Sequence, residues 1–363
     1  MPEATIENFT VRHVCFPETT VPETHPINLN IRLIANVLPS FCFVLTVMWG
    51  QNARCGEVSN MRLDGFIAIQ GEMENTDNIG IDDVEAELTL KTPRKKRTRA
   101  VITVDGKFYR RCVYLEDLYI DHRFNSKLRL TVGISKKVLG LEYENGRKYR
   151  ASIHRSPIYQ KMESLGIVGR QFNLKLSGKT GSGDGLKWSG ALGADGTRDM
   201  NALVSIEKPF GNFGVGTWLM LEAHKVGSYY DPAYSHVFSF WANTDFLRIA
   251  IELFTGNDTK QTEYNEIFGD DRIVFFGGTK FEVRGKHRFS KELTLNPVFQ
   301  TSFWTNDLDN YLDNTLHFLL GARFKFQRIA VSLNGEITGD RTANSNRRVF
   351  NDKALYVEIF FDF

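Results

Sequence analysis

The sequence contains little of what marks several other classes of protein. It has only 10 prolines and four cysteines in 363 residues, and its 45 lysines and arginines nearly balance its 43 aspartates and glutamates. A net charge of +2 is too small for a chain that coats nucleic acid, so no nucleic-acid partner is predicted. The cysteines and histidines have no spacing typical of a metal or haem site, and no arrangement of serine, histidine and aspartate indicates catalysis. No cofactor and no enzyme activity are therefore expected.

Long apolar runs are also scarce, and the mean hydropathy of −0.28 is too low for a helical membrane protein. The one continuous run, 33–49, follows Arg32 and precedes small residues. This order predicts a secretory signal peptide with cleavage near Ala53. A transmembrane anchor is the alternative, but the run is at the lower limit of length for spanning and is interrupted by Asn36 and Pro39.

The residues before this run are unusual for a leader. Residues 1–31 contain four glutamates and show no apolar periodicity. We interpret them as an extension upstream of the true start site; an unusually long polar leader is the alternative. The expected organisation is a start-site extension plus signal peptide at 1–53 and one mature domain at 54–363.

Aromatic residues, by contrast, are abundant: they form 12% of the chain, and phenylalanine alone occurs 28 times. Aromatic and β-branched residues favour strands. From Met61 onward about sixteen segments alternate between apolar and polar residues, and no convincing helix is predicted. The clearest alternation lies at 84–91, 128–135, 172–177, 247–254, 316–327 and 329–338.

The connections between these segments alternate in length. Short ones are predicted at 124–127, 243–245 and 327–328, and longer polar ones near 223–233, 257–271, 305–313 and 340–352. Long strands joined alternately by short turns and longer loops are typical of a membrane barrel, whose lumen-facing residues keep the overall hydropathy low. The predicted fold class is therefore all-β: a transmembrane antiparallel β-barrel of about 16 strands.

The last strand carries a further signal. Apolar side chains occupy every second position from Leu355 to Phe363, whereas Glu358 and Asp362 lie on the other face. This pattern resembles the terminal strand of bacterial outer-membrane barrels, whose final aromatic residue is part of the signal read by the barrel-insertion machinery. The resemblance implies a location in the bacterial outer membrane, in contact with its lipid and lipopolysaccharide. The apolar face is then expected to meet lipid, and the strand to pair with 61–74 to close the barrel; the edge strand of a soluble sheet is the alternative.

One predicted connection, 138–168, is long and has both apolar and basic residues, and by our count it is the third outer loop. Apolar residues would hold such a loop against the barrel wall and charged ones would face a permeating solute, so the loop is expected to fold inward. The candidate constriction residues on it are Arg147, Lys148, Arg150, Arg155 and Lys161. Strand parity adds inward-facing candidates on the wall, namely Arg129, Lys175, Arg323 and Lys325.

The segments around this loop carry a family resemblance. The sequences at 133–142 (GISKKVLGLE), 154–157 (HRSP) and 169–172 (GRQF) resemble the phosphate-selective porin O and P family. The resemblance implies a sixteen-stranded, trimeric barrel whose third loop folds inward and whose basic residues guide anions. The family's phosphate-binding residues do not align with this chain, so phosphate selectivity itself is not implied.

Together these patterns predict an outer-membrane porin for passive diffusion of small, phosphate-like anions. One alternative is a barrel that encloses a multihaem cytochrome in an electron conduit, and another is a surface adhesion barrel. The basic residues have a second interpretation as well, since they would also suit a surface that faces lipopolysaccharide.

Overall fold

The computed structural model describes residues 61–363 together with Val14–Cys15. Internal segments at 76–77, 94–96, 108–111, 145–146, 148–149, 151, 182–183, 195–199, 227–228, 259–261, 263–272, 309–313 and 342–347 are outside this description. The signal peptide predicted within 1–53 and the candidate Lys148 therefore lie outside the described residues. None of the described helices is long and apolar enough to cross a membrane.

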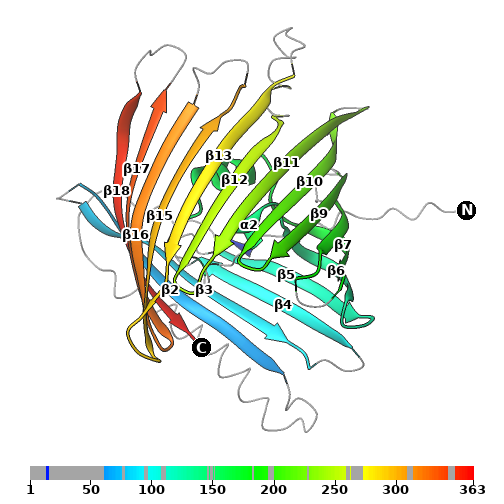
Figure 1. Ribbon diagram of the computed structural model, residues 1–363, viewed down its shortest axis with the longest axis horizontal. Coiled ribbons are helices and arrows are strands. Elements are labelled where there is room, and N and C mark those ends of the chain that lie inside the picture. Colours follow the sequence, from blue (N-terminus) through cyan, green and yellow to red (C-terminus); the bar gives the residue numbers. More distant parts are fainter. Residues whose placement is uncertain are drawn as a thin grey trace, which may run out of the picture.

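Sixteen long strands run antiparallel, each beside its neighbour in the sequence, and form one sheet (Figure 1). They are β2 (Arg62–Asn75), β3 (Asn78–Lys91), β4 (Thr98–Lys107), β5 (Cys112–Arg123), β6 (Leu128–Lys137), β7 (Gly169–Lys179), β8 (Lys187–Ala194), β9 (Met200–Phe210), β10 (Phe213–Val226), β11 (Tyr229–Asn243), β12 (Leu247–Asn257), β13 (Phe275–Gly285), β15 (Leu293–Thr305), β16 (Asn314–Phe326), β17 (Ile329–Arg341) and β18 (Val349–Asp362). Two further strands have only two residues each. Strand β1 (Val14–Cys15) pairs with β5, and β14 (His287–Arg288) pairs with β15.

The sheet closes on itself through β18 and β2. Leu355 pairs with Met73 and Asp362 with Phe66, in an unbroken antiparallel register between these two strands. Closure leaves neither of them as a free edge, which is what a sheet inside a membrane requires. The predicted all-β barrel of about 16 strands, closed by its terminal strand, is confirmed.

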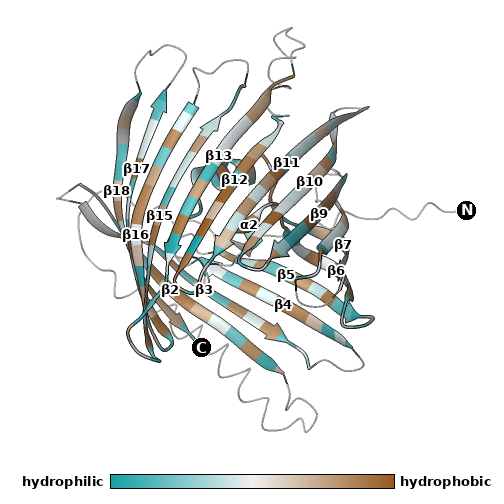
Figure 2. Ribbon diagram, in the orientation of Figure 1, coloured by the Kyte–Doolittle hydropathy of each residue, from teal (hydrophilic) through white to brown (hydrophobic). Residues whose placement is uncertain are grey.

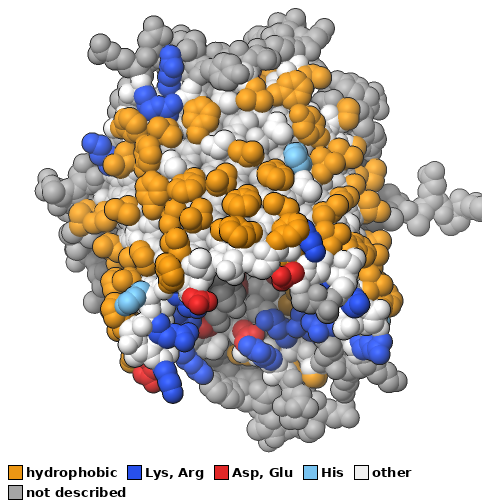
Figure 3. All heavy atoms as spheres, in the orientation of Figure 1, with side chains coloured by type: hydrophobic (Ala, Val, Ile, Leu, Met, Phe, Trp, Pro, Cys, Tyr) orange, Lys and Arg blue, Asp and Glu red, His pale blue; other side chains and the backbone are white. Residues whose placement is uncertain are grey.

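The two faces of the sheet differ as the alternation predicts. On β7, Phe172 and Leu174 are 54% and 47% exposed, whereas Gln171 and Asn173 point inward and are buried. Figure 2 shows the same alternation of apolar and polar residues along most strands, and Figure 3 shows apolar side chains spread across the outer face of the strands in front. Lipid-facing apolar residues and a polar interior explain how a chain of low mean hydropathy builds a membrane barrel.

The two ends of the barrel also differ. At the end that carries Phe363, here the turn end, strands are joined by connections as short as 211–212 and 327–328. At the opposite end, here the loop end, 138–168 and 258–274 form the longest connections. The long connection predicted at 223–233 is wrong, because Val226 pairs with Tyr229 and only 227–228 separate β10 from β11. Aromatic and β-branched residues extend this hairpin through a segment whose charges suggested a loop.

Candidate functional site

The third loop of the loop end, 138–168, turns into the lumen as predicted. It contains two helices, α2 (Leu141–Glu144) and α3 (Pro157–Ser164), which the sequence analysis did not predict. Pro157 begins α3 directly after Ser156, at the position where proline's fixed φ suits a helix. After α3 the chain reverses at Gly166 (φ 78°), and the Ile167 amide donates to the Met162 carbonyl. Such a reversal at glycine is a common way to end a helix.

An apolar cluster attaches the loop to one side of the lumen. From the loop it contains Leu139, Leu141, Tyr143, Ile158, Tyr159, Met162, Ile167 and Val168, and from the wall Leu203, Trp218, Met220, Val237, Trp241, Ala250, Phe254, Phe276 and Trp304. The Tyr159 ring meets Phe254 edge-on at 5.3 Å between centroids. The wall from β9 to β15 therefore presents apolar side chains to the lumen where the loop covers them, and their burial favours this position of the loop.

A buried ion cluster lies within this contact. Lys280 Nζ on β13 is 2.7 Å from Glu142 of α2, 3.3 Å from Glu252 and 3.5 Å from Glu282. Glu142 also accepts hydrogen bonds from the Ser156 amide at 2.7 Å and the Ser156 hydroxyl at 2.8 Å. Burial by itself raises the pKa of Glu142, but Lys280 and Ser156 outweigh burial and hold that pKa below its ordinary value. The loop carboxylate is thus charged and fully bonded.

Glu252 ties two further groups of the loop to the wall. The Tyr159 hydroxyl donates to it at 2.8 Å, and the Leu141 amide donates to it at 2.7 Å. Burial and the nearby Glu252 carboxylate raise the pKa of Tyr159, so the phenol stays a donor. Gly140 precedes these contacts at φ 84°, and a Cβ there would overlap the Tyr159 hydroxyl. Only glycine fits this approach without strain.

The loop is also fastened to a second part of the wall, around β18, β2 and β3. Arg147 donates to Glu358 of β18 at 2.7 Å, to Glu85 of β3 and to Gln70 of β2 at 3.2 Å. From the wall, Arg323 of β16 donates to the Arg147 carbonyl at 3.3 Å. Arg147 therefore neutralises two lumen carboxylates rather than standing free in the opening.

His154 extends this second attachment. Its Nε2 is 2.7 Å from the Gln70 amide nitrogen, its Nδ1 is 3.6 Å from Glu336 of β17, and its ring meets Tyr356 of β18 edge-on at 4.4 Å. The loop thus touches a continuous arc of the wall that runs from β9 through β18 to β2 and β3, which is more than half of the circumference. It crosses the lumen instead of lying along one wall.

The remaining loop cations that the structure describes have different surroundings. Arg150 is buried, and burial beside Arg155 and Arg147 lowers its pKa to about 9, which leaves it charged at neutral pH. The Arg155 guanidinium lies 4.2 Å from the centre of the Tyr143 ring and donates to the Glu142 carbonyl at 3.3 Å. Lys161 is half-buried on α3. Arg147, Arg150 and Arg155 therefore lie near enough to influence one another, but Arg147 and Arg155 are bonded to other groups of the wall and the loop.

A second place does bring cations together. A cavity of about 470 Å³ lies between α2 and strands β5–β10, towards the turn end. It is lined by six basic residues, Arg123, Lys127, Arg129, Lys175, Lys179 and Lys187, and by two acidic ones, Glu144 and Glu207. Two of the predicted wall residues, Arg129 and Lys175, belong to this basic cavity. Arg323 and Lys325 are not part of it, since Arg323 is buried under the loop and Lys325 is exposed on β16 at the turn end.

Strand register places like charges opposite each other around the basic cavity. Arg123 pairs with Arg129, and Lys179 pairs with Lys187. Directly opposed like charges destabilise a sheet. Arg129 is compensated by Asp121 at 2.5 Å and Lys187 by Glu207 at 3.7 Å. Lys175, half-buried, makes no hydrogen bond or ion pair with any residue that the structure describes.

The sequence analysis missed four of these cavity residues, namely Arg123, Lys127, Lys179 and Lys187. A usable signal was present, because all four lie within a few residues of turns at the same end of the barrel as Arg129. Figure 3 shows charged side chains of both signs around a hollow near the turn end.

No protein-family model matches the chain, and no curated protein matches it in sequence. Solved outer-membrane proteins nevertheless share its fold. OmpT of Vibrio cholerae, folded in vitro, has a TM-score of 0.58 at 10% identity, over 85% of this chain and 100% of that chain. The outer-membrane channel DcaP of Acinetobacter baumannii gives 0.57 at 9% identity, over 84% and 97%. An anion-selective porin from Comamonas acidovorans gives 0.55 at 10% identity, over 84% and 99%.

The fold is that of an outer-membrane porin. These structural neighbours are outer-membrane proteins, so they confirm the fold class and agree with the predicted outer-membrane location. Likeness at these identities extends to the fold alone. No family match supports the phosphate-selective O and P family, so the finer family resemblance remains a prediction.

Proposed function

We propose that this porin-type barrel is a channel through which small solutes diffuse passively across the outer membrane, and that it favours small anions. The observation that carries this proposal is the basic cavity, in which six cations face two carboxylates beside the crossing loop. A narrow passage lined by one sign of charge raises the local concentration of the opposite ion.

Lys175 is the residue best placed to meet a permeating anion. Its ammonium is half-buried, has no direct bond to any described residue, and lies in the cavity wall opposite Glu144 of the loop. Moving an anion to Lys175 therefore breaks no existing ion pair. Arg147, by contrast, would have to leave Glu85 and Glu358 before it could bind a solute.

This assignment changes where selectivity is expected. The sequence analysis assigned the constriction charges to Arg147, Lys148, Arg150, Arg155 and Lys161. We propose that the described members of that set mainly position the loop, whereas the basic cavity, and Lys175 in particular, sets the potential. The homotrimer and the phosphate-like solute remain predictions from the family resemblance.

The other functions find less support. A sheath must leave room for the cytochrome that it encloses, but the loop crosses this lumen and contacts two separate parts of the wall. An adhesin is expected to carry large outer loops, whereas the described long loop folds inward. Neither function is proposed.

Planar-bilayer recording tests the proposal. With purified barrel and a tenfold potassium chloride gradient, the reversal potential should have the sign of chloride preference, and phosphate and sulfate should reduce chloride conductance. Lys175→Gln should move the reversal potential towards cation preference, while Lys291→Gln, an exposed turn residue outside the cavity, should leave it unchanged. Clear cation preference of the unmodified barrel would contradict the proposal, and so would the absence of any channel conductance.

A further inference from the structure

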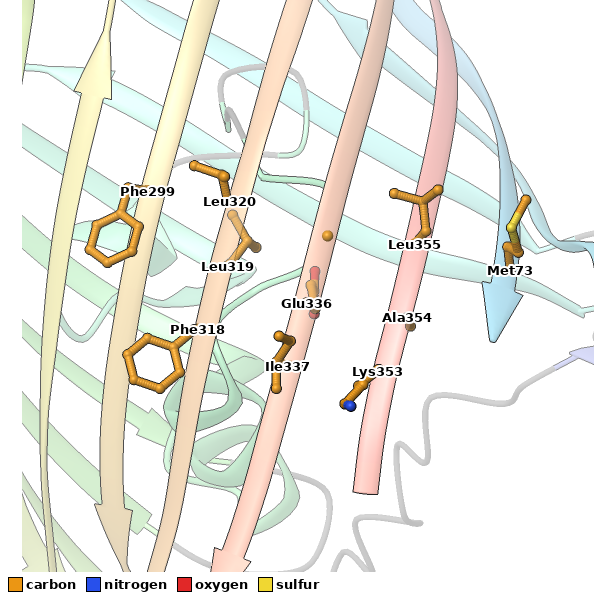
Figure 4. A pocket seen from close by; sticks show the side chains of 11 residues that line it. Met73, Phe299, Phe318, Leu319, Leu320, Glu336, Ile337, Lys353, Ala354 and Leu355 are labelled. Carbon is orange, nitrogen blue, oxygen red and sulfur yellow. The ribbon is translucent and has the colours of Figure 1, made fainter. Parts of the chain in front are cut away.

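A groove interrupts the lipid-facing surface of β15–β18 and β2. It has a volume of about 450 Å³ and lies over Gly335 of β17. Gly335 pairs with Leu320 on β16 and with Leu355 on β18, both of which are outward-facing. The missing side chain of Gly335 leaves the floor of the groove open. Its apolar rim consists of Met73, Phe299, Phe318, Leu320, Ile337 and Leu355 (Figure 4).

A cation lies at one end of this groove. Lys353 pairs with Ile337, so it shares the outward face, two residues nearer the loop end than Leu355. It is exposed and makes no hydrogen bond or ion pair with any described residue. The odd-numbered residues from Leu355 to Phe363 are apolar and exposed, and nine residues of tilted strand cover an apolar band of about 25 Å. Lys353 is therefore at the border between acyl chains and head groups.

A second basic residue continues this border on the neighbouring strand. Arg341 follows Ile337 by four residues on β17 and so has the same outward parity. Its buried Nε has no hydrogen-bond partner among the described residues. An apolar groove with a cation at one end, and a second cation of the same parity on the neighbouring strand, fits an amphiphile with an acyl chain and an anionic head.

We propose that this groove binds an acyl chain of lipopolysaccharide, with a phosphate of the lipid head group on Lys353. The lipid part of lipopolysaccharide combines several acyl chains with more than one phosphate, which matches cations spread over two strands. The assignment assumes that the loop end faces outward, as the proposed porin orientation requires; it does not depend on what the channel conducts. Basic residues beside a membrane surface strengthen binding of anionic lipids.

Two substitutions address the two parts of the site. Gly335→Leu fills the groove, and it should fold because a Cβ at Gly335 meets only the Leu320 carbonyl at an ordinary 3.8 Å. Lys353→Gln removes the cation but keeps the length of the side chain. Matched controls are Gly190→Leu, an outward glycine of β8 with nothing within 4 Å of its added Cβ, and Lys291→Gln at the turn end.

The experiment is a titration of the full-length barrel, purified in detergent, with lipopolysaccharide lacking its long polysaccharide, followed by native mass spectrometry. We expect Lys353→Gln to weaken binding about fivefold and Gly335→Leu about tenfold or more, with both controls unchanged. Unchanged binding in Gly335→Leu overturns the proposal. Equal affinity for phosphatidylglycerol overturns the assignment to lipopolysaccharide.

Light scattering on the same samples separates lipid from a second copy of the chain. If the groove is a subunit interface, Gly335→Leu should reduce the molar mass of the assembly and leave lipopolysaccharide binding intact, which also overturns the proposal. Channel conductance of Gly335→Leu should stay normal in either case, because the substitution lies outside the lumen. Failure of this proposal is therefore distinguishable from failure of the channel proposal.

Discussion

The two sides of the lumen use charge in different ways. Where the loop meets β12 and β13, Lys280 and three carboxylates are almost fully buried and bonded to one another. Across β6–β9 the cations line a cavity, and Lys175 has no direct bond to a described residue. Buried, mutually bonded charges fix a structure at a cost in desolvation, whereas accessible ones remain available to a solute. Counting basic residues along a loop therefore says little about the pore until their partners are known.

The largest expected effect comes from Lys280→Met. It leaves Glu142, Glu252 and Glu282 buried without their shared cation, which typically costs about 3–5 kcal/mol. We expect the loop to leave the wall, with a lower unfolding temperature and higher, noisier single-channel conductance. Glu142→Gln should have a milder effect because Lys280 keeps two carboxylates. Wild-type conductance in Lys280→Met would contradict the proposed anchoring role of this cluster.

Gly140→Ala should be next in size. The positive φ and the overlap with the Tyr159 hydroxyl together should cost about 2–3 kcal/mol of unfolding free energy. Gly166→Ala is the matched control, since it has a similar φ of 78° but open space around the added Cβ, so about 1 kcal/mol is expected. Thermal unfolding in detergent measures both. Equal losses would mean that close approach to Tyr159 is not what requires glycine.

Acid should also weaken the attachment of the loop through Glu142, but by less than Lys280→Met does. The pKa of Glu142 is held below its ordinary value of 4.5, so its contribution to stability is complete above that pH and is lost as pH falls through the lowered value. Conductance noise is therefore expected to rise only as the pH falls below 4.5. Glu142→Gln should show noise that no longer changes in this range because it lacks the titrating group. An identical acid response in both proteins would assign the effect elsewhere.

The smallest effect tests the other side of the comparison. Lys175→Gln should lower the permeability ratio of chloride over potassium roughly twofold to threefold, with little change in stability, because no direct bond to a described residue is lost. The measurement is the reversal potential at two salt concentrations. The difference from the unmodified barrel should shrink in 1 M salt, where charges are screened within about 3 Å. A large fall in unfolding temperature would show instead that Lys175 has a structural role.

Local sequence patterns were enough to predict most of the fold. The alternation around Phe172 and from Leu355 to Phe363 identified the lipid-facing residues and the closing strand, because a two-residue period is written in the sequence itself. The mixed composition of 138–168 correctly indicated an inward loop. Helix α3 was missed, although Ser156-Pro157 is a recognisable helix start.

Contacts between residues far apart in the sequence could not be predicted. That Glu142 meets Lys280, or that Arg147 meets Glu358, depends on how far the loop extends and which wall it touches. No spacing in the chain encodes those distances. The same applies to the basic cavity, since Arg129 and Lys187 become neighbours only when β6, β7 and β8 lie in register.

The double attachment of the loop has a mechanical consequence. Arg147 holds it to β3 and β18, while Glu142 and Tyr159 hold it to β12 and β13 on a separate part of the wall. A segment fixed to two separate parts of the wall acts as a tie inside the cylinder and resists flattening of its cross-section. The barrel should therefore keep a round outline under lateral membrane pressure, and cutting either attachment should make it measurably more compliant.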